Sequence, residues 1–435
     1  MNTIYISVVL KFSIRDFPLS LYEIFLVMHQ VMNKLGKLLV VEFIKRLEKE
    51  AEQSLKERGC VRHSYQERTF QGILGKMTIR FLKVKHPNGK IKYALGDTVT
   101  LPSYVRYTED AFEPGLGLLP HVSYKRSSLE IKRINGSSPG KSTLHRRLHA
   151  IASQVEAHPT EKVRGYRYLI VDGTGARFQR SIRGKPKKVK TYPGELRIVY
   201  ASKGIGESYD VIGRWTNTSW KKIAHAIYQR IDEKDVRVLI SDGGPGIEEA
   251  FLKPHMKHQR CSVHAWRNLR AFLYQDGVKK DAQQSIYKVF QNTPVFRYSK
   301  KKTMESLNPE DSALVEREIH ASEHHLLHLQ DLLKEKGYQK TAMYVANLSK
   351  PLLTFLREWL TTGEVHPSTS NIAESRFSLI KNRIARIGRR WSEPGLKRWL
   401  DLAIYKLFPG YDWNELWKTL LPLTGNLSCE IVSVH

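Results

Sequence analysis

The sequence predicts a mixed α/β protein, and the order of its apolar runs is the main reason. Between residues 166 and 264, strand-like runs alternate with helical stretches. Strands are expected at 168–171, 196–200, 209–213, 236–241 and 259–263, and helices at 220–231 and 247–252. Residues 265–365 carry no strand pattern and are expected to be helical, including 313–336 and 342–360.

The order of these elements narrows the fold class. The expected order is three strands, then a helix, a strand, a helix and a final strand. This is the order of the ribonuclease-H-like fold, in which the first and fourth strands are adjacent. We therefore expect an RNase H-like catalytic core formed by residues 161–264 and 366–435. The all-helical block at 265–365 would be an insertion into this core, and the Trp-rich tail through Trp413 and Trp417 should pack back on it.

The chain before the core divides into three segments. Residues 1–60 have helical patterning, and residues 61–120 contain short strand-like runs around the turn Pro87-Asn-Gly, which predicts a small β-rich module. Residues 121–160 predict two short helices joined by a turn, the layout of a helix-turn-helix whose second helix reads DNA. An ordinary basic helical hairpin fits the same pattern. The second helix would offer Lys141, Ser142, Thr143, His145, Arg146 and Arg147.

The charge of the chain indicates a polyanionic partner. The 71 Lys and Arg residues outnumber the 43 Asp and Glu residues, for a formal net charge of +28. Nucleic acid is the leading expectation, although ribosomal or membrane-surface roles fit the charge alone. The three cysteines are scattered, which excludes a disulfide framework, and no apolar segment reaches membrane-spanning length. We expect a cytoplasmic protein, nucleoid-associated if the source is prokaryotic.

Two carboxylates close matching strands. Asp172 ends the run Tyr-Leu-Ile-Val-Asp-Gly, and Asp242 ends Val-Leu-Ile-Ser-Asp-Gly. Glu374 follows much later, at the start of a basic helical stretch. Each Asp-Gly alone is a common strand-ending turn, and a Glu on a surface helix usually faces water. Together the three acids predict a site for two divalent ions, Mg²⁺ or Mn²⁺, acting on a phosphate backbone.

Three other motifs have simpler explanations. Gly136-Ser-Ser-Pro-Gly-Lys-Ser resembles a phosphate loop, but its first Gly is one residue too close and no apolar strand precedes it. His320, His324 and His328 share a helix face that we expect to face solvent. Cys261 and His264 have no second Cys/His pair to complete a zinc site.

Four motifs in order resemble those of a known family. The motifs are Asp-Gly at Asp172, Ser-Asp-Gly-Gly-Pro-Gly at Asp242, Cys-Ser-Val-His-Ala-Trp-Arg-Asn from Cys261 to Asn268, and Ser-Asn-Ile-Ala-Glu-Ser around Glu374. In this order they resemble the motifs of the Mutator-like superfamily of DDE transposases, which includes prokaryotic insertion-sequence transposases. The resemblance implies that Asp172, Asp242 and Glu374 form the metal-binding catalytic triad. It also implies that Cys261, His264 and Asn268 form an adjacent active-site motif.

Basic residues near these motifs are candidates for phosphate contacts. A ridge follows Glu374, and a second cluster follows the first strand; a solvated charged helix is the simpler explanation of the ridge. The residues are Lys187, Lys188, Arg376, Lys381, Arg383, Arg386, Arg389 and Arg390.

The resemblance implies a transposase that cleaves at the ends of a mobile element and joins them to target DNA. Its partners would be double-stranded DNA, as terminal inverted repeats and target, and further copies of the chain in a homodimer or larger synaptic complex. Two alternatives remain: an RNase H-like nuclease or resolvase that only cleaves, and a domesticated DNA-binding protein without catalysis. A broken acid triad would favour the last, and the triad is intact in the sequence.

Overall fold

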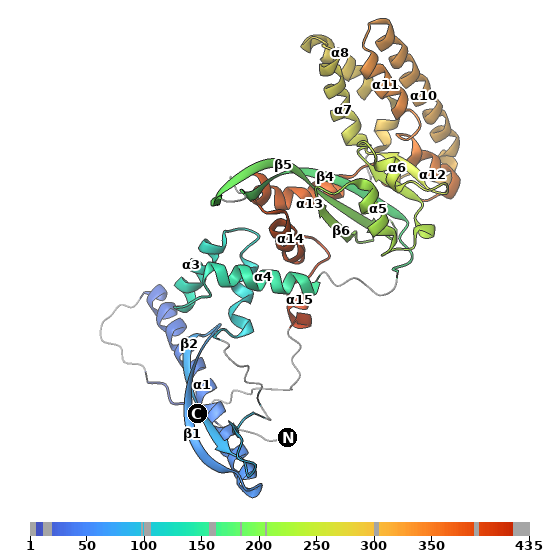
Figure 1. Cartoon of the computed structure of the whole chain (residues 1–435). Helices are drawn as coiled ribbons and strands as arrows, with labels where there is room; N and C mark the ends of the chain where they lie inside the picture. The colour runs from blue at the N-terminus through green and yellow to red at the C-terminus, as the bar shows by residue number, and fades with distance from the viewer. Residues whose placement is uncertain are drawn as a thin grey trace. The chain divides into compact units, whose positions relative to one another are not determined.

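The computed structural model describes residues 6–11, 20–96, 99, 106–155, 162–182, 185–204, 207–299, 304–386 and 391–420. The chain forms two compact units (Figure 1). Unit 1 comprises Met1–Ile151 and Trp413–His435, and unit 2 comprises Ala152–Asp412. Among the helices within the described residues, none combines the length and apolar character that crossing a bilayer requires.

Unit 1 begins with a long helix and a small antiparallel sheet. The elements are α1 (Leu21–Glu57), β1 (Val61–Gly72), β2 (Gly75–Lys85) and β3 (Ile91–Tyr93), with the strands in the order β1-β2-β3. Phe70, Ile79 and Phe81 form a buried cluster against Val40, Val41 and Ile44 of α1. The sequence did not indicate β1, because most of its side chains are polar and exposed and so give no alternating apolar pattern.

The rest of unit 1 is helical. It contains η1 (Glu109–Ala111), α2 (Glu113–Gly117), α3 (Tyr124–Asn135), α4 (Lys141–Val155) as far as Ile151, and α15 (Trp413–Leu420). Ser123 caps α3 by accepting a hydrogen bond from Arg126 N at 3.1 Å, and Gly136 ends the helix with φ of 72°. Helices α3 and α4 therefore lie where the sequence predicts them.

The Trp-rich tail corrects one expectation. The sequence suggested that it packs on the α/β core, but α15 belongs to unit 1. Trp413 Nε1 donates a hydrogen bond to Glu113, and its ring lies against Gly117. A buried indole needs both an apolar neighbour and a hydrogen-bond acceptor, and α2 supplies both.

Unit 2 is built on a five-stranded mixed sheet in the order β6-β5-β4-β7-β8. Its strands are β4 (Tyr168–Ile182), β5 (Lys185–Ser202), β6 (Asp210–Thr216), β7 (Val238–Ser241) and β8 (Lys257–Arg260). The pairs β4–β5 and β5–β6 are antiparallel, whereas β4–β7 and β7–β8 are parallel. The first and fourth strands of the unit are thus neighbours, as the sequence predicts. Strand β8 ends earlier than expected because Cys261 caps a helix that starts at Ser262.

Helices cover both faces of this sheet. Helices α5 (Trp220–Tyr228) and α6 (Ile247–Phe251) bury one face, where they enclose Leu169, Val171 and Val199. Helices α13 (Asn371–Lys381) and α14 (Glu393–Leu407) lie on the other (Figure 1). Residues Tyr168 to Val171 of β4 are all at most 1% exposed, which fits a strand buried on both faces.

The segment between β8 and α13 is helical, as predicted. It contains α7 (Ser262–Gln275), α8 (Lys280–Gln291), η3 (Pro294–Ser299), η4 (Pro309–Asp311), α10 (Ser312–Glu335), α11 (Gln339–Leu348) and α12 (Thr354–Thr362). The single helix expected at 342–360 is two helices, because Pro351 cannot continue a helix. His320, His324 and His328 are exposed on α10, as expected.

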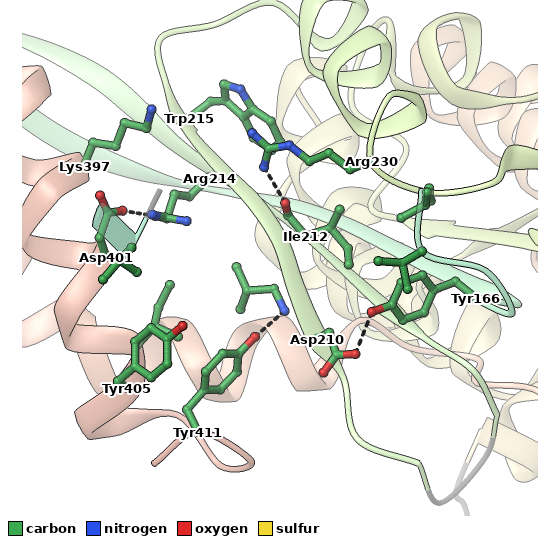
Figure 2. A pocket seen from close by; sticks show the side chains of 15 residues that line it. Tyr166, Asp210, Ile212, Arg214, Trp215, Arg230, Lys397, Asp401, Tyr405 and Tyr411 are labelled. Carbon is green, nitrogen blue, oxygen red and sulfur yellow. Dashed lines mark hydrogen bonds and ion pairs between the residues drawn. The ribbon is translucent and has the colours of Figure 1, made fainter. Parts of the chain in front are cut away.

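A pocket of about 250 Å³ lies along the edge strand β6 (Figure 2). Its polar groups pair with one another. The Arg214 guanidinium binds Asp401 of α14, and Tyr166 Oη donates to Asp210 at 2.7 Å. The edge itself is covered, since Val211 N donates to Tyr411 Oη at 2.6 Å and Arg230 donates to Ile212 O at 2.6 Å. These contacts satisfy two backbone groups of an edge strand, which leaves fewer groups free to pair with another chain.

The buried Arg214–Asp401 pair gives a test of how α14 is held. The Asp401 side chain is fully buried and that of Arg214 is 13% exposed. Arg214→Met should therefore lower the free energy of unfolding by about 3–5 kcal/mol, because it removes the paired charge of a buried carboxylate. Urea denaturation followed by tryptophan fluorescence measures this. The double variant Arg214→Met/Asp401→Leu should recover most of the loss, and a single variant within about 1 kcal/mol of the parent would contradict the assignment.

Candidate functional site

Strand register places the first two acids side by side. In the parallel pair of β4 and β7, Val171 lies opposite Ser241. Asp172 and Asp242 are the next residues along the chain, so they occupy adjacent positions where β7 ends. Strand β4 runs on past the expected end at 171, and Asp172 still pairs with Ile198 of β5. Asp172 is 4% exposed and accepts a hydrogen bond from Gly173 N at 2.7 Å.

The turn after β7 is fixed by local hydrogen bonds. Asp242 Oδ1 accepts from Gly244 N at 2.8 Å, and Ser241 Oγ accepts from Gly243 N at 3.0 Å. Gly243 has φ of 69°, and a Cβ there would clash with the Arg260 guanidinium. Glycine is therefore required at this position both for conformation and for space.

Glu374 lies in the first turn of α13 and is held by two side chains of α7. The Arg267 guanidinium grips the carboxylate with two nitrogens, and the second contact, Nη2 to Oε2, is 3.0 Å. His264 Nε2 lies 3.3 Å from Glu374 Oε1. The two helices are thus joined at the carboxylate.

Cys261 and His264 form a network behind Glu374. Ser370 N donates to Cys261 Sγ at 3.2 Å, and Ser370 Oγ lies 3.3 Å from His264 Nδ1. Burial opposes the charged forms of both Cys261 and His264. The hydrogen bond and charge between them outweigh burial, so the pKa of Cys261 is lowered and that of His264 is raised. Asn268, one turn along α7, affects the pKa of Tyr344, whose hydroxyl donates to Ala265 O at 3.1 Å.

The surroundings of Asp172 favour its protonated form. The pKa of Asp172 is raised to about 7, chiefly by burial; the charge of His264 and the hydrogen bond from Gly173 oppose this rise, and the charges of Asp242 and Glu374 add to it. The structure places Asp172 and Asp242 at adjacent strand positions and sets Glu374 against His264. That the three acids form one catalytic site stays a prediction.

The donor chemistry of this site fits a divalent cation. Three carboxyl groups would supply hard oxygen ligands, and burial of Asp172 disfavours its carboxylate unless a positive charge is close by. Across the described part of the chain, however, no three His, Cys, Asp or Glu side chains are close enough together to hold an ion in this conformation. The oxygens of Glu374 are instead directed at Arg267 and His264.

Three of the predicted phosphate contacts are corrected by the structure. Arg376 is 2% exposed, and it donates to Tyr209 O at 2.6 Å and to Pro409 O at 3.3 Å. Arg383 is 3% exposed and lies over the Trp391 ring. Arg147 is bound by Glu109 and lies over the Phe112 ring. These guanidinium groups hold the fold together, and sequence patterning cannot distinguish such arginines from exposed ones.

The remaining candidates for DNA contact fall into two groups: those whose side chains the structure describes and those whose side chains it does not. Lys141, Ser142, His145, Arg146 and Lys381 are exposed, and Thr143 is half-buried. The backbones of Lys187 and Lys188 belong to β5 and that of Arg386 to a π-helical turn (Asn382–Arg386), but their side chains lie outside the described residues, as do Arg389 and Arg390.

Two residues of the site were missed by sequence reasoning. Arg267 stands three residues after His264, so helical spacing places both on one face of α7 and could have found it. Ser370 gives no comparable signal, because its role depends on how α13 meets α7.

Comparison with known proteins identifies the family. Residues 26–308 match the family model described as "Transposase, Mutator family", a range that includes Asp172 and Asp242 and ends before Glu374. Among solved structures, a chain of the Drosophila P element transposase strand transfer complex is similar at 12% sequence identity, with 68% of this chain and 92% of that chain covered and a TM-score of 0.36. No curated protein sequence matches. Because the family match covers more than half of its 435 residues, the chain belongs to the Mutator family of transposases.

Proposed function

We propose that this protein is a DDE transposase that cleaves DNA at the ends of a mobile element and transfers the strand into target DNA. The observation that carries the proposal is the register that sets Asp172 beside Asp242, with Glu374 in the same electrostatic environment. Family membership supports the general class of activity.

The sheet of unit 2 is proposed to be an RNase H-like core. Its order β6-β5-β4-β7-β8, with β5 antiparallel to its neighbours and the rest parallel, supports this because it sets the first and fourth strands together. The helical segment from α7 to α12 would then be an insertion between the second and third acids.

Asp172, Asp242 and Glu374 are proposed to hold two Mg²⁺ or Mn²⁺ ions. When bound, such ions activate the attacking oxygen and stabilise the leaving oxygen in a phosphodiester displacement. The chain prepares this site in two ways. Burial of Asp172 disfavours its free carboxylate, which increases its demand for a cation, and the hydrogen-bonded turn holds Asp242 at the strand end.

Recognition of double-stranded DNA is assigned to unit 1. Helices α3 and α4 have the layout of a helix-turn-helix, and α4 presents Lys141 and Arg146 to solvent. Terminal inverted repeats and target DNA are the proposed partners, and further copies of the chain would assemble into a synaptic complex. A nuclease that only cleaves is the second candidate; joined strand-transfer products separate it from a transposase.

The acid site can be tested by removing one charge. Asp172→Asn should abolish cleavage and strand transfer in Mg²⁺ or Mn²⁺ while DNA affinity stays within about twofold, because the amide cannot replace a carboxylate as cation ligand. Cleavage and joining are measured with end-labelled element DNA. Asp331→Asn on the exposed surface of α10 is the matched control and should keep full activity. Activity retained by Asp172→Asn would remove this residue from the site.

The same variant should gain stability, and the gain should depend on pH. The pKa of Asp172 is raised to about 7 in the folded protein and is about 4 when unfolded, so the folded state holds the proton more tightly. The contribution of Asp172 to stability is therefore intact below pH of about 4, declines as pH rises to about 7 and stays low above that.

Relative to wild type, Asp172→Asn should become more stable by several kcal/mol, on the order of 4, between pH 4 and pH 8. Urea denaturation without divalent ions at both pH values checks this. The difference between Asp331→Asn and wild type should be the same at both pH values. A pH-independent difference for Asp172→Asn would show that its carboxyl group has an ordinary pKa.

The DNA-recognition proposal predicts a change in salt dependence. Lys141→Ala/Arg146→Ala should weaken binding to element ends and reduce the slope of log K against log salt by about 2, one for each lost phosphate contact. Fluorescence anisotropy across a salt series measures both quantities. Lys336→Ala/Lys340→Ala removes the same charge from exposed sites at α10 and α11 and should leave the slope unchanged. Equal slopes for the two variants would count against α4 as the DNA-reading helix.

A further inference from the structure

The carboxylate of Glu374 already has a cationic partner on each oxygen. Arg267 contacts Oε1 through Nη1 and Oε2 through Nη2, the latter at 3.0 Å. His264 Nε2 adds a contact of 3.3 Å to Oε1. A two-pronged arginine contact of this kind satisfies both oxygens in the plane of the carboxylate.

The two partners of Glu374 differ in their freedom. The side chain of His264 is 16% exposed, and its other ring nitrogen lies 3.3 Å from Ser370 Oγ, so the ring is fixed from both sides. The side chain of Arg267 is 57% exposed. Arg267 can therefore leave Glu374 by rotating into solvent without disturbing the packing of α7, whereas His264 cannot.

A divalent cation and Arg267 compete for the same carboxylate. Mg²⁺ and Mn²⁺ bind carboxylate oxygens directly, and both oxygens of Glu374 are already engaged by Arg267, with His264 also on Oε1. In this conformation the acids of the described chain are not close enough to hold an ion together, and the Arg267 contact directs Glu374 toward α7. Binding of a divalent ion by all three acids would therefore be favoured by release of Glu374 from Arg267.

We propose that Arg267 is an exchangeable counter-cation that competes with the divalent ion for Glu374 and, once displaced, binds the DNA phosphate at the same site. The proposal rests on the proposed function. A phosphodiester oxygen offers a guanidinium the same kind of charged acceptor as a carboxylate. The released side chain stays on α7 beside the acids, three residues from His264, where a phosphate must come for cleavage.

The proposed competition predicts the direction in which Mn²⁺ affinity changes when Arg267 is removed. Removing Arg267 should tighten Mn²⁺ binding to the DNA-free protein by about fivefold, the equivalent of about 1 kcal/mol for a part-exposed ion pair. If Arg267 merely held Glu374 in place for the ion, its removal would weaken Mn²⁺ binding instead.

The experiment compares Arg267→Gln with Arg270→Gln. Arg270 lies three residues further along α7, over the Tyr287 ring at 3.9 Å, so its loss matches the change in charge without touching Glu374. Calorimetric titration with Mn²⁺ should give tighter binding for Arg267→Gln than for wild type and no tightening for Arg270→Gln. Arg267→Lys, which keeps the charge but loses the two-pronged contact, should fall between wild type and Arg267→Gln. Thermal unfolding confirms that each variant is folded.

A second measurement tests the transfer to DNA. In Ca²⁺, which also takes oxygen ligands, Arg267→Gln should lower the salt slope of DNA binding by about 1, and without divalent ions the slope should match that of wild type. A slope lowered in both conditions, or in neither, overturns the exchange. Mn²⁺ affinity equal to or weaker than that of Arg270→Gln overturns the competition. Failure of the wild type itself to bind Mn²⁺ would instead overturn the proposed metal-dependent function.

Discussion

The parallel pairing of β4 with β7 is the constraint on which the site depends. Because Val171 lies opposite Ser241, two carboxylates that are seventy positions apart in the chain occupy adjacent positions where β7 ends. A shift of one residue in either strand would turn one of these aspartates to the opposite face of the sheet. The apolar runs before Asp172 and Asp242 are buried on both faces, and that burial is what holds the register.

Gathering acids at this edge has an energetic cost that the surrounding residues only partly offset. Asp172 is buried among like charges, so its pKa rises, while Glu374 is neutralised by Arg267 and His264. A site of this kind is less stable than an apolar edge would be, and stability lost at a functional site is a familiar compromise. Cys261 and Ser370 limit the cost by fixing His264 in one orientation.

The sequence predicted the parts of the molecule that follow from periodicity and missed those that follow from tertiary contact. The order of strands in unit 2, the helical segment after β8 and the positions of α3 and α4 were all readable, because buried runs and helix caps leave local signals. Strand β1 was not readable, since its side chains are mostly exposed. Pro351 marked a break that the helical pattern on either side concealed.

For the candidate site, the sequence allowed residue types to be chosen, but it did not show how buried each side chain would be. Strand register sets Asp172 and Asp242 at adjacent positions, and Glu374 contacts His264. Arg376 and Arg383 are buried, although their spacing suggested a phosphate-binding ridge. The positive charge of an arginine in the sequence does not show whether its side chain faces solvent or binds a backbone carbonyl. Arg267 was overlooked for the opposite reason, because one basic residue within a quoted motif is not conspicuous until its partner is known.

The return of α15 to unit 1 has a consequence for biosynthesis. Unit 1 is formed from both ends of the chain, and the Trp413 indole completes a surface made by α2 about three hundred residues earlier. On the ribosome, the strands and helices of unit 2 therefore emerge before α15 does. The nascent chain can form its α/β sheet while the surface of α2 that Trp413 covers is still exposed.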